Sequence, residues 1–435
     1  MQNVNLANKN ICVVGMGLTG LSCARFLLAK GANVTAMDSR SELALSLDMP
    51  LMLGELDAAV LCQADLIVIS PGVDLRTPAI QEAIVTGVLV VGDIELFALF
   101  NTTPVIAITG SNGKSTVTHL VTEMCQAAGK KALMGGNIGV PALDLLEQPA
   151  DVIVLELSSF QLETTFSLRP LAATVLNVSE DHLDRHGDLR AYQKIKLSIF
   201  DHCQFLVCNR DDELSIPANK NVAISYGLSP SHSGFSWDPN QANILFNEQL
   251  FLDPETCLLV SAHNMVNIQA AAALAKLFGI DDSSIRKGAQ NFGGLPHRCQ
   301  TVSKFNNVSW INDSKATNVG ATLAAINGLN AQNQGKLILI AGGEGKGADF
   351  SVLADCLNQS VSLLITLGKD GDKIASLHSN TVKVQSIQEA VATASKHSEA
   401  GDIVLLSPAC ASLDMFVNYQ QRGECFAKAV EALAA

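Results

Sequence analysis

The chain has 435 residues, of which 48% are hydrophobic and only 16% are charged, compared with about 25% charged residues in an average globular protein. This composition excludes an extended disordered chain, and the length predicts about three domains at roughly 150 residues each. The 29 basic and 42 acidic residues give a net charge of −13. This balance argues against a nucleic-acid-binding protein, because such proteins present a basic surface.

The cysteines and the N-terminal residues favour a cytoplasmic protein. The 11 cysteines are scattered and include no C-x-x-C pair, so we expect neither a disulfide framework nor a zinc site. Residues 1–10 are polar and lack the apolar region of a signal peptide. The apolar runs are short or interrupted by Gly, Asn and Gln, so no membrane span is expected.

The first part of the chain alternates strand and helix patterns. The apolar residues 11–14 predict a strand, the glycine-rich residues 15–20 predict a turn, and a helix is predicted to about Lys30. Residues 33–37 and 66–69 predict two further strands. Strands that alternate with helices form parallel sheets with helices on both faces.

Two further α/β units follow. Residues 221–260 contain short alternating segments with Gly, Pro and Asn, which predict antiparallel β structure, and the Ala-rich residues 263–278 predict a helix. The strands predicted in these units lie at 105–108, 152–155, 171–176, 205–208, 336–340, 363–366 and 403–406. The sequence therefore predicts an α/β protein with the domains 1–92, 93–295 and 296–435.

Residues 109–116 read Thr-Gly-Ser-Asn-Gly-Lys-Ser-Thr and lie between a predicted strand and a predicted helix, as a phosphate-binding loop does. Glycines let backbone N–H groups approach phosphate oxygens, Lys114 adds a positive charge, and the Ser115 hydroxyl is placed to bind Mg²⁺. The standard loop has a glycine five positions before Gly113, where this chain has Ile108. The alternative is a glycine turn beside a surface lysine, but the order of strand, loop and helix favours phosphate binding.

Two polar side chains follow the strands predicted near this loop. Glu156 follows residues 152–155, and His182 follows residues 171–176 in a polar cluster with Asp181. The carboxyl ends of parallel strands meet at one edge of a sheet, where such sheets bind ligands, so Glu156 is a candidate Mg²⁺ ligand. A histidine in such a place is often an ordinary loop residue, but its position beside the expected metal favours a function.

Gly15, Gly17 and Gly20, followed by Asp38, match the fingerprint of a dinucleotide-binding turn. The simplest interpretation is a nicotinamide-dependent dehydrogenase. Such an enzyme needs no second phosphate loop, however, and Arg40 could meet a nucleotide phosphate. The alternative is a uridine nucleotide held by the same turn, since glycine N–H groups at a helix N-terminus bind any diphosphate.

Six segments together resemble the Mur ligase family, and the resemblance extends over essentially the whole chain. Members of this family have the same shortened phosphate-loop sequence. Its members that add the third amino acid or the dipeptide lack an N-terminal Gly-x-Gly turn. The L-alanine-adding members have Thr-His-Gly-Lys in the loop, and the related folylpolyglutamate synthases lack the N-terminal unit. The turn, Asn112 and residues 407–412 resemble the branch that adds D-glutamate. The six segments are 15–20, 109–116, 135–139, 177–184, 294–298 and 407–414.

The resemblance implies an N-terminal Rossmann-like domain for the UDP substrate, a P-loop ATPase-like central domain for ATP and a C-terminal Rossmann-like domain for the amino acid. It implies ATP-dependent amide formation between UDP-N-acetylmuramoyl-L-alanine and D-glutamate in cytoplasmic peptidoglycan precursor synthesis. The substrate carboxylate attacks the γ-phosphate to form an acyl phosphate, the amine of D-glutamate attacks it, and phosphate leaves. We expect a monomer without nucleic-acid partners.

The resemblance also implies catalytic and metal-binding residues. Lys114 would stabilise the charge of the transferring phosphoryl group, Ser115 and Glu156 would hold one Mg²⁺, and His182 would hold a second. Lys196 corresponds to the family's carbamylated lysine. Addition of CO₂ converts its ammonium group into a carboxylate-like metal ligand.

Two questions stay open on the sequence, the role of Lys196 and the class of protein. Spacing alone makes Lys196 an ordinary solvated lysine on a helix face, and Lys194 is the competing position if the register differs. A nicotinamide dehydrogenase and a non-catalytic nucleotide-binding module are the alternatives to a ligase.

Three further sets of residues correspond to substrate-binding positions of the family. The UDP-substrate set is Leu18, Thr19, Asp38, Ser39, Arg40, Ser70, Gly72 and Asn137. The ATP set is Gly110, Ser111, Asn112, Gly113, Lys114, Ser115, Thr116, Asn267, Arg298 and Asp313. The D-glutamate set is Lys315, Thr317, Lys346, Ser412, Leu413 and Tyr419. It contains the cations and neutral donors that two carboxylates need. Asn267 is alternatively a buried polar group of its helix, and Tyr419, where the family often has Phe, lines the pocket or packs in the core.

Overall fold

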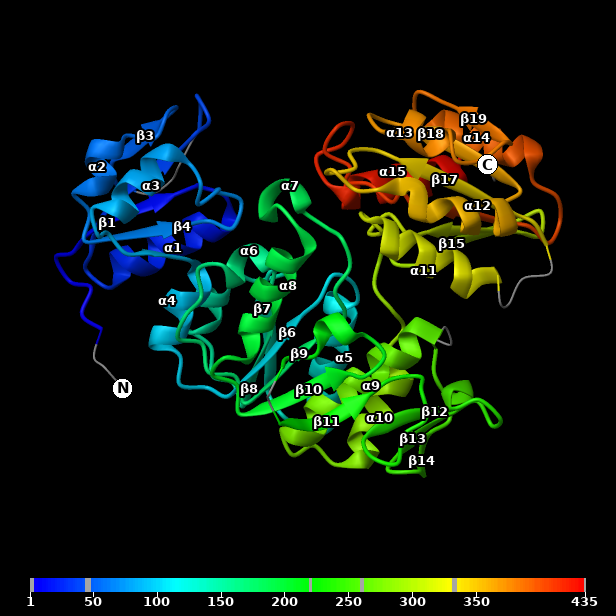
Figure 1. Cartoon of the computed structure of the whole chain (residues 1–435), viewed down its shortest axis with the longest axis horizontal. Helices are drawn as coiled ribbons and strands as arrows, with labels where there is room; N and C mark the ends of the chain where they lie inside the picture. The colour runs from blue at the N-terminus through cyan, green and yellow to red at the C-terminus, as the bar shows by residue number, and fades with distance from the viewer. Residues whose placement is uncertain (1–3, 44–47, 219–220, 259–261, 331–334, 434–435) are drawn as a thin grey trace. The chain divides into compact units, whose positions relative to one another are not determined.

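The computed structural model describes residues 4–43, 48–218, 221–258, 262–330 and 335–433 (Figure 1). These residues fall into two compact units. Unit 1 comprises Met1–Asn177, Gln193–Asp253 and Ile268–Gln290, and unit 2 comprises Val178–Tyr192, Pro254–Asn267 and Asn291–Ala435. The predicted domain boundaries at residues 92 and 295 stay predictions.

The first sheet of unit 1 has five parallel strands in the order β3-β2-β1-β4-β5. Its strands are β1 Asn10–Val14, β2 Asn33–Asp38, β3 Leu51–Leu53, β4 Leu66–Ile69 and β5 Val90–Val91. Its helices are α1 Leu18–Ala29, α2 Ala58–Cys62 and α3 Pro78–Val85. This strand order reverses direction between β1 and β4, and doubly wound sheets bind ligands at such a switch point. The loops after β1 and β4 therefore form the expected ligand site of this sheet.

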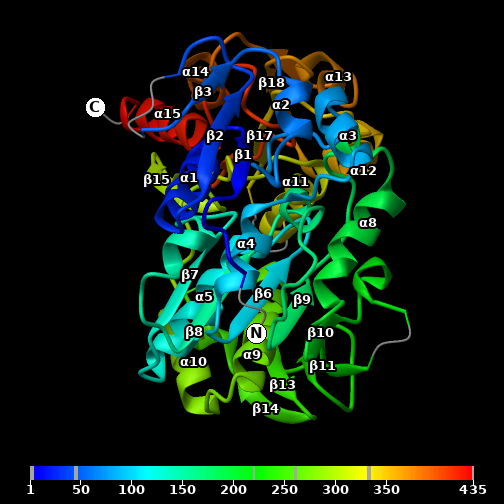
Figure 2. The same cartoon turned by 90° about the vertical axis from the view of Figure 1, so that its left-hand side faces the viewer.

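The second sheet of unit 1 has six parallel strands in the order β11-β10-β9-β6-β8-β7 (Figure 2). They are β6 Val105–Thr109, β7 Ala132–Gly136, β8 Val152–Glu156, β9 Ala172–Val175, β10 Phe205–Asn209 and β11 Val222–Tyr226. β6 and β8 are buried along their whole length, because helices cover both faces of a parallel sheet. The connections from β6 and β9 leave in opposite directions, so this pair is the switch point.

A third, antiparallel sheet completes unit 1 with β12 Phe235–Asp238, β13 Asn243–Phe246 and β14 Gln249–Leu252. The prediction of antiparallel structure over 221–260 is correct for these strands and wrong for β11, which extends the parallel sheet. The other helices that begin before residue 290 are α4 Asp93–Phe100, α5 Lys114–Ala127, α6 Ser159–Leu162, α7 Leu183–His186, α8 Leu189–Leu197, α9 Ala262–Leu277 and α10 Asp282–Asn291.

The sheet of unit 2 has the order β15-β16-β20-β17-β18-β19, and only the β15–β16 pair is antiparallel. Its strands are β15 Gln300–Phe305, β16 Val308–Asn312, β17 Leu337–Gly342, β18 Leu363–Leu367, β19 Thr381–Lys383 and β20 Ile403–Leu406. Its helices are α11 Val319–Asn330, α12 Ala354–Ser360, α13 Gly371–Ala375, α14 Ile387–His397 and α15 Tyr419–Glu431. Apolar layers cover both faces, and the direction of winding changes between β17 and β20.

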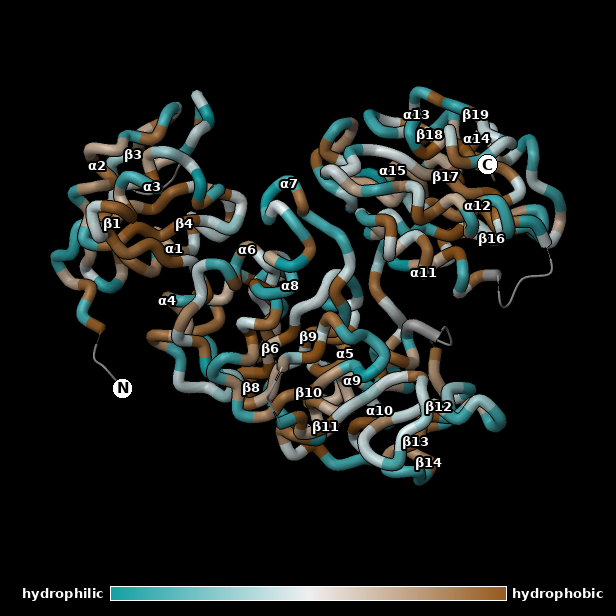
Figure 3. Tube along the Cα trace, viewed as in Figure 1, coloured by the Kyte–Doolittle hydropathy of each residue, from teal (hydrophilic) through white to brown (hydrophobic). Residues whose placement is uncertain are grey.

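Short 3₁₀ turns complete the secondary structure at η1 Ala142–Leu145, η2 Ser198–Phe200, η3 Glu213–Ser215, η4 Pro254–Thr256 and η5 Phe350–Leu353. Hydrophobic residues concentrate on the strands of the sheets and hydrophilic residues on many of the loops between the elements (Figure 3). The predicted α/β class, with parallel sheets and a small antiparallel sheet, is confirmed. Within the described ranges, no helix is both long and apolar enough to cross a membrane.

Candidate active site

The predicted phosphate loop connects β6 to α5 through two backbone conformations that favour glycine. Gly110 and Gly113 have φ angles of 154° and 86°, in the region that side chains disfavour. The Lys114 Nζ atom donates to the carbonyl oxygens of Gly110 and Ser111 at 2.7 and 3.0 Å. The 14-residue helix α5 begins at Lys114, so the positive end of its dipole faces the loop.

Lys196 is buried beside this loop. Its side chain is on α8, the residue is 1% exposed, and Nζ donates to the Gly110 carbonyl at 2.9 Å. Lys194, on the same helix, is exposed. The structure therefore brings Lys196 rather than Lys194 to the phosphate loop, and Lys196 is not the solvated surface lysine of the alternative interpretation.

Glu156 ends β8 directly beside the end of β6, where it pairs in register with Ile108. The residue is 1% exposed, and its Oε1 atom accepts a hydrogen bond from the Asn137 side chain at 2.7 Å. Its Oε2 atom is buried and has no hydrogen-bond partner among the residues that the structure describes. A buried carboxylate oxygen without a hydrogen-bond partner among the described residues is a suitable ligand for a hard cation such as Mg²⁺.

The donor set around the loop fits Mg²⁺ better than a metal held by protein ligands alone. The described residues contain no cluster of three or more His, Cys, Asp or Glu side chains that could enclose an ion. Mg²⁺ usually takes one or two carboxylates, with water and substrate phosphates as its other ligands. Glu156, together with the buried Ser115 on the loop, meets that description.

Asn137 lies beside Glu156, the candidate Mg²⁺ ligand. Its backbone N–H donates to the Glu156 carbonyl at 2.8 Å, in addition to the side-chain bond. The preceding Gly136 has a φ angle of 97°, and a Cβ atom there would lie 2.4 Å from the same carbonyl. Asn137 thus orients the carboxylate, and its expected contact with the UDP substrate stays a prediction.

Asn177 has a structural role that sequence reasoning missed. It follows β9, and its side-chain Oδ1 accepts from the Asn112 N–H at 2.8 Å while its Nδ2 donates to the Asn112 carbonyl at 3.0 Å. Its own carbonyl accepts from the Ser111 N–H at 2.9 Å. The residue therefore holds the phosphate loop from the neighbouring strand end.

We expect Asn177→Ala to raise the KM for ATP about tenfold, because losing two hydrogen bonds of about 1 kcal/mol each loosens the loop. Steady-state kinetics measures this change. Asn101→Ala is the matched control, since Asn101 makes the same reciprocal pair with the Thr103 backbone before the start of β6. An equal rise in KM for both variants contradicts a local effect on the loop.

The glycine turn of the first sheet is closed against β4. A Cβ atom on Gly20 would lie 1.9 Å from the Gly15 carbonyl, so only glycine fits. The Ser70 hydroxyl donates to the same carbonyl at 2.5 Å, which joins the loops at the switch point. Leu18, in the first turn of α1, is 79% exposed and is available to a ligand.

Asp38 is fully engaged by protein groups. It accepts the Met16 N–H at 2.7 Å and a two-pronged contact from Arg40, with both nitrogen–oxygen distances at 2.7 Å. The Arg40 guanidinium holds the pKa of the Asp38 carboxyl well below its usual range. A dehydrogenase would use this acid for ribose hydroxyls, whereas here the acid anchors a half-exposed arginine beside the turn. The arrangement favours a nucleotide phosphate at Arg40.

The other expected UDP-substrate residues lie on these same loops. Thr19 is half-buried on α1, Ser39 is exposed between Asp38 and Arg40, and Gly72 is exposed after β4. The structure therefore gathers this set around the β1–β4 switch point, with Asn137 as the exception on the second sheet.

The expected D-glutamate residues of unit 2 follow three neighbouring strands. Lys315 and Thr317 follow β16, Ser412 and Leu413 follow β20, and Lys346 follows β17. The switch point of this sheet lies between β17 and β20, where a ligand site is expected. The two loops there also pair through an isolated bridge between Glu344 and Ala411.

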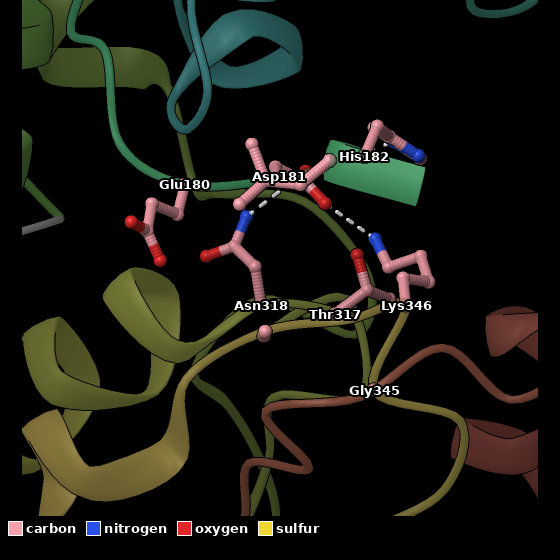
Figure 4. Close-up of a pocket in the computed structure, with 9 residues that line it drawn as sticks. Glu180, Asp181, His182, Thr317, Asn318, Gly345 and Lys346 are labelled. Carbon is pink, nitrogen blue, oxygen red and sulfur yellow. Dashed lines mark hydrogen bonds and ion pairs between the residues drawn. The ribbon is translucent and has the colours of Figure 1, made fainter. Parts of the chain in front are cut away.

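Lys346 forms an ion pair with Asp181 in this structure (Figure 4). The Nζ–Oδ1 distance is 2.5 Å, both side chains are largely buried, and Asn318 donates to the other oxygen of Asp181 at 3.3 Å. His182 and Thr317 line the same cavity of about 10 Å³, roughly the space that one water molecule needs. Lys346 is therefore already neutralised, and an incoming carboxylate would compete with Asp181.

His182 belongs to unit 2, whereas Ser115, Glu156 and Lys196 belong to unit 1. It is the N-cap residue directly before α7 and has a φ angle of 54°, and its Nε2 lies 3.7 Å from an Asp181 oxygen. Asn267 is half-buried on α9, also in unit 2. The expected roles of His182 in metal binding and Asn267 in ATP binding stay predictions.

Asp313 is buried at the end of β16. Its carboxylate accepts from the Ser407 hydroxyl at 2.8 Å and from the Cys299 N–H at 3.2 Å. Burial raises the pKa of Asp313 to about 6, and the charge of Arg298 acts in the opposite direction. The structure therefore brings these two expected ATP residues close together.

We expect Asp313 to make stability depend on pH. Its folded-state pKa is raised above the unfolded value of about 4, so the folded protein binds more protons between about pH 4 and 6 and loses stability as pH rises through that window. Relative to Asp313→Asn, the wild-type melting temperature should fall between pH 4.5 and 7.5. Thermal unfolding measures both proteins, and their difference in melting temperature removes the contributions of the other titratable groups. A difference that does not change with pH contradicts the assignment.

Arg422 is a second residue that sequence reasoning missed. It is buried on α15, and it donates to the Ser314 carbonyl at 2.7 Å and to the Cys410 carbonyl at 3.1 Å. Burial lowers its pKa to about 10. The half-buried Tyr419, at the start of the same helix, places its ring centroid 4.1 Å from the Lys315 Nζ. This helix therefore supports two of the three loops that carry expected D-glutamate residues, those after β16 and β20.

Comparisons with known proteins identify the family to which this chain belongs. Three family models match: "Mur ligase MurD-like, N-terminal domain" over residues 9–92, "Mur ligase middle domain" over 108–275 and "Mur ligase, glutamate ligase domain" over 297–410. The chain is 46% identical over 434 residues to the UDP-N-acetylmuramoylalanine–D-glutamate ligase of Haemophilus influenzae strain PittEE, covering 98% of this chain and 99% of that one. It is 48% identical over 431 residues to the enzyme of the same name from Shewanella oneidensis, covering 97% and 98%.

Solved structures show the same fold at lower identity. The UDP-N-acetylmuramate-alanine ligase of Thermotoga maritima has a TM-score of 0.65 at 18% identity, with 98% of this chain and 100% of that chain covered. The MurF ligase of the same organism, solved in complex with ADP, has a TM-score of 0.64 at 17% identity, with 99% and 96% covered. From the family models and the full-length similarity, the chain belongs to the Mur ligase family.

Proposed function

We propose that this chain is an ATP-dependent, ADP-forming ligase that joins D-glutamate to UDP-N-acetylmuramoyl-L-alanine. One observation carries the proposal. Buried Lys196 and Glu156 adjoin a phosphate loop in a chain that is 46–48% identical, over nearly its full length, to relatives named as D-glutamate ligases. Residues 1–92 would bind the UDP substrate, 93–295 ATP and 296–435 the amino acid.

In the first step, the carboxylate of the UDP substrate attacks the γ-phosphorus of ATP. A carboxylate oxygen–phosphorus bond forms, the bond to the bridging oxygen breaks, and ADP leaves. The protein contributes position and charge, since phosphoryl transfer needs little else. The N–H groups of the phosphate loop would hold the phosphates, and Lys114 would exchange its contacts with the loop carbonyls for the transferring group.

In the second step, the amine of D-glutamate attacks the acyl carbon. A carbon–nitrogen bond forms, and the bond between the acyl carbon and the phosphate oxygen breaks. Phosphate leaves with the electron pair of that bond, and the amine nitrogen releases a proton to solvent. Lys315, Thr317, Lys346, Ser412 and Leu413 would orient the amino acid from the loops after β16, β17 and β20. A carboxylate of D-glutamate would replace Asp181 as the partner of Lys346.

Bound Mg²⁺ would neutralise phosphate charge during transfer. Ser115 and Glu156 would hold one ion, His182 would hold a second, and carbamylated Lys196 would add a carboxylate-like metal ligand. The ammonium group of Lys196 lies against the Gly110 carbonyl, and a carbamate at this place would offer anionic oxygens to a cation. ATP and UDP-linked sugars are cytoplasmic metabolites, so we place the reaction there and expect the protein to act as a monomer.

Substrate omission tests the proposal. Phosphate release should require ATP, Mg²⁺, UDP-N-acetylmuramoyl-L-alanine and D-glutamate together. A dehydrogenase would instead bind NAD(H) or NADP(H) at the first sheet. A non-catalytic module would bind ATP without turnover. If the complete mixture releases no phosphate, the result contradicts the ligase proposal.

A further inference from the structure

Helix α4 carries two buried carboxylates that the proposed mechanism does not use. Asp93 and Glu95 lie in its first turn and are 1% and 7% exposed. The helix follows the first sheet directly, and the Gly92 N–H bonds the Thr164 carbonyl at 3.2 Å. Buried carboxylates are costly unless they are bonded, so their partners indicate what they do.

Asp93 holds the side chain of Gln161. Its Oδ2 atom accepts from the Gln161 Nε2 at 3.1 Å, and Gln161 is itself buried. The other oxygen, Oδ1, has no hydrogen-bond partner in the described part of the chain. Burial raises the pKa of Asp93 to about 6. Within the described residues, the one hydrogen bond that Asp93 makes to a side chain is therefore directed at Gln161.

The bond to Asp93 decides which way the Gln161 amide points. With Nε2 directed at Asp93, Oε1 faces Ser158 and accepts its N–H at 3.1 Å. The Gln161 N–H in turn donates to the Ser158 hydroxyl at 3.2 Å, which completes a capping box at the start of α6. Asp93 thus fixes the cap of this helix.

The Ser158 cap lies in the turn that directly follows Glu156 in the chain. Ser158 is two residues beyond Glu156, and Leu157 between them is bonded on both sides to the end of β6. Its N–H donates to the Ile108 carbonyl at 2.8 Å, and its carbonyl accepts from the Thr109 hydroxyl at 2.7 Å. A chain of hydrogen bonds therefore runs from Asp93 through Gln161 and Ser158 to the turn that aims Glu156.

We propose that Asp93 is a positioning residue for the magnesium-binding carboxylate of Glu156, acting through Gln161 and the Ser158 cap. The inference rests on the proposed function, because it takes Glu156 as a metal ligand. Outer-shell partners of metal ligands orient the ligand atoms, and their loss typically weakens metal binding by about 10- to 100-fold.

Glu95 is the matched control for Asp93. It lies in the same turn of α4, is also buried, and binds the same stretch of chain. Its carboxylate accepts the N–H groups of Phe166 and Ser167 at 2.6 and 2.8 Å. These residues follow α6 and take no part in the Ser158 cap, so Glu95 shares the structural role of Asp93 without the link to Glu156.

The experiment compares Asp93→Ala, Asp93→Asn and Glu95→Ala by two readouts. One is the Mg²⁺ concentration that gives half-maximal activity. The other is binding of Mn²⁺, as a paramagnetic substitute, in the presence of ATP, followed by electron paramagnetic resonance. Asp93→Ala should weaken both by about tenfold, and Asp93→Asn should restore both because its amide oxygen still accepts from Gln161. Glu95→Ala should lower the melting temperature and leave both metal readouts as in the wild type.

Unchanged Mn²⁺ binding in Asp93→Ala would overturn the inference, as would an equal loss in Glu95→Ala. If Asp93→Ala does not fold, Gln161→Met takes its place, because it removes the bond to Asp93 and the bond to the Ser158 N–H while keeping a side chain of similar length. Its Mn²⁺ binding should weaken by about tenfold, and unchanged binding would overturn the inference. The Mn²⁺ titration needs no turnover. A wild-type protein without ligase activity therefore contradicts the proposed function separately from the link between Asp93 and Glu156.

Discussion

Lys196→Ala should lower kcat by at least about 100-fold while the affinity for ATP stays within a few-fold of the wild type. Removing a side chain that binds the metal directly should lower activity by more than removing a hydrogen-bond partner of a metal ligand, which typically costs about 10- to 100-fold. The contact of Nζ with the Gly110 carbonyl places Lys196 against the predicted phosphate loop. Single-turnover kinetics and an ATP-binding titration separate the two effects.

Lys194→Ala is the control for this variant, because Lys194 lies on the same helix and is exposed. Its kinetics should match those of the wild type. Carbamylation has its own readout, since ¹³CO₂ should give a carbamate carbon signal by NMR in the wild type and in Lys194→Ala but not in Lys196→Ala. Full activity of Lys196→Ala, or the same signal in that variant, contradicts the carbamate assignment.

Glu156→Gln should affect activity and stability in different ways. Activity should fall by about 100-fold or more, because an amide is a poor ligand for Mg²⁺ and Oε2 is the atom left for the ion. The free energy of unfolding should stay within about 1 to 2 kcal/mol of the wild type or rise, because a buried charge is replaced by a neutral group of the same shape. Kinetics over a range of Mg²⁺ concentrations and chemical denaturation measure the two quantities.

The control for Glu156→Gln is Asp151→Asn, an exposed carboxylate at the opposite end of the same strand. It should leave the dependence on Mg²⁺ unchanged. Near-normal activity of Glu156→Gln at low Mg²⁺ would show that another residue holds the ion. A large loss of stability would mean that Glu156 supports the fold rather than the reaction.

Strand ends and glycine turns are the parts that sequence reasoning predicts well here. Strands β4 and β20 have the predicted bounds, because each is a buried apolar run closed by polar or turn residues. The phosphate loop and the first glycine turn are local motifs whose backbone conformation follows from a few residues. Glu156 is predictable for the same reason, since it directly ends a buried strand.

Contacts between distant segments are what the sequence leaves out. Asn177 binds Asn112, Arg422 binds Ser314, and Asp93 binds Gln161 across 68 positions. No local pattern pairs such residues, because their partners are set by strand order. The edge strand β7 escapes prediction because two of its five residues are glycines. Lys196 shows the same limit: its burial follows from packing and not from its spacing on the helix.

The most direct test of the account is the identity of the product. The protein would be incubated with ATP, Mg²⁺, UDP-N-acetylmuramoyl-L-alanine and either D-glutamate, L-glutamate or another amino acid, and the products analysed by mass spectrometry. We predict a single product with the mass of UDP-N-acetylmuramoyl-L-alanyl-D-glutamate, formed with D-glutamate and one equivalent of phosphate. Formation of a different aminoacyl product, or phosphate release without an amide product, would contradict the account.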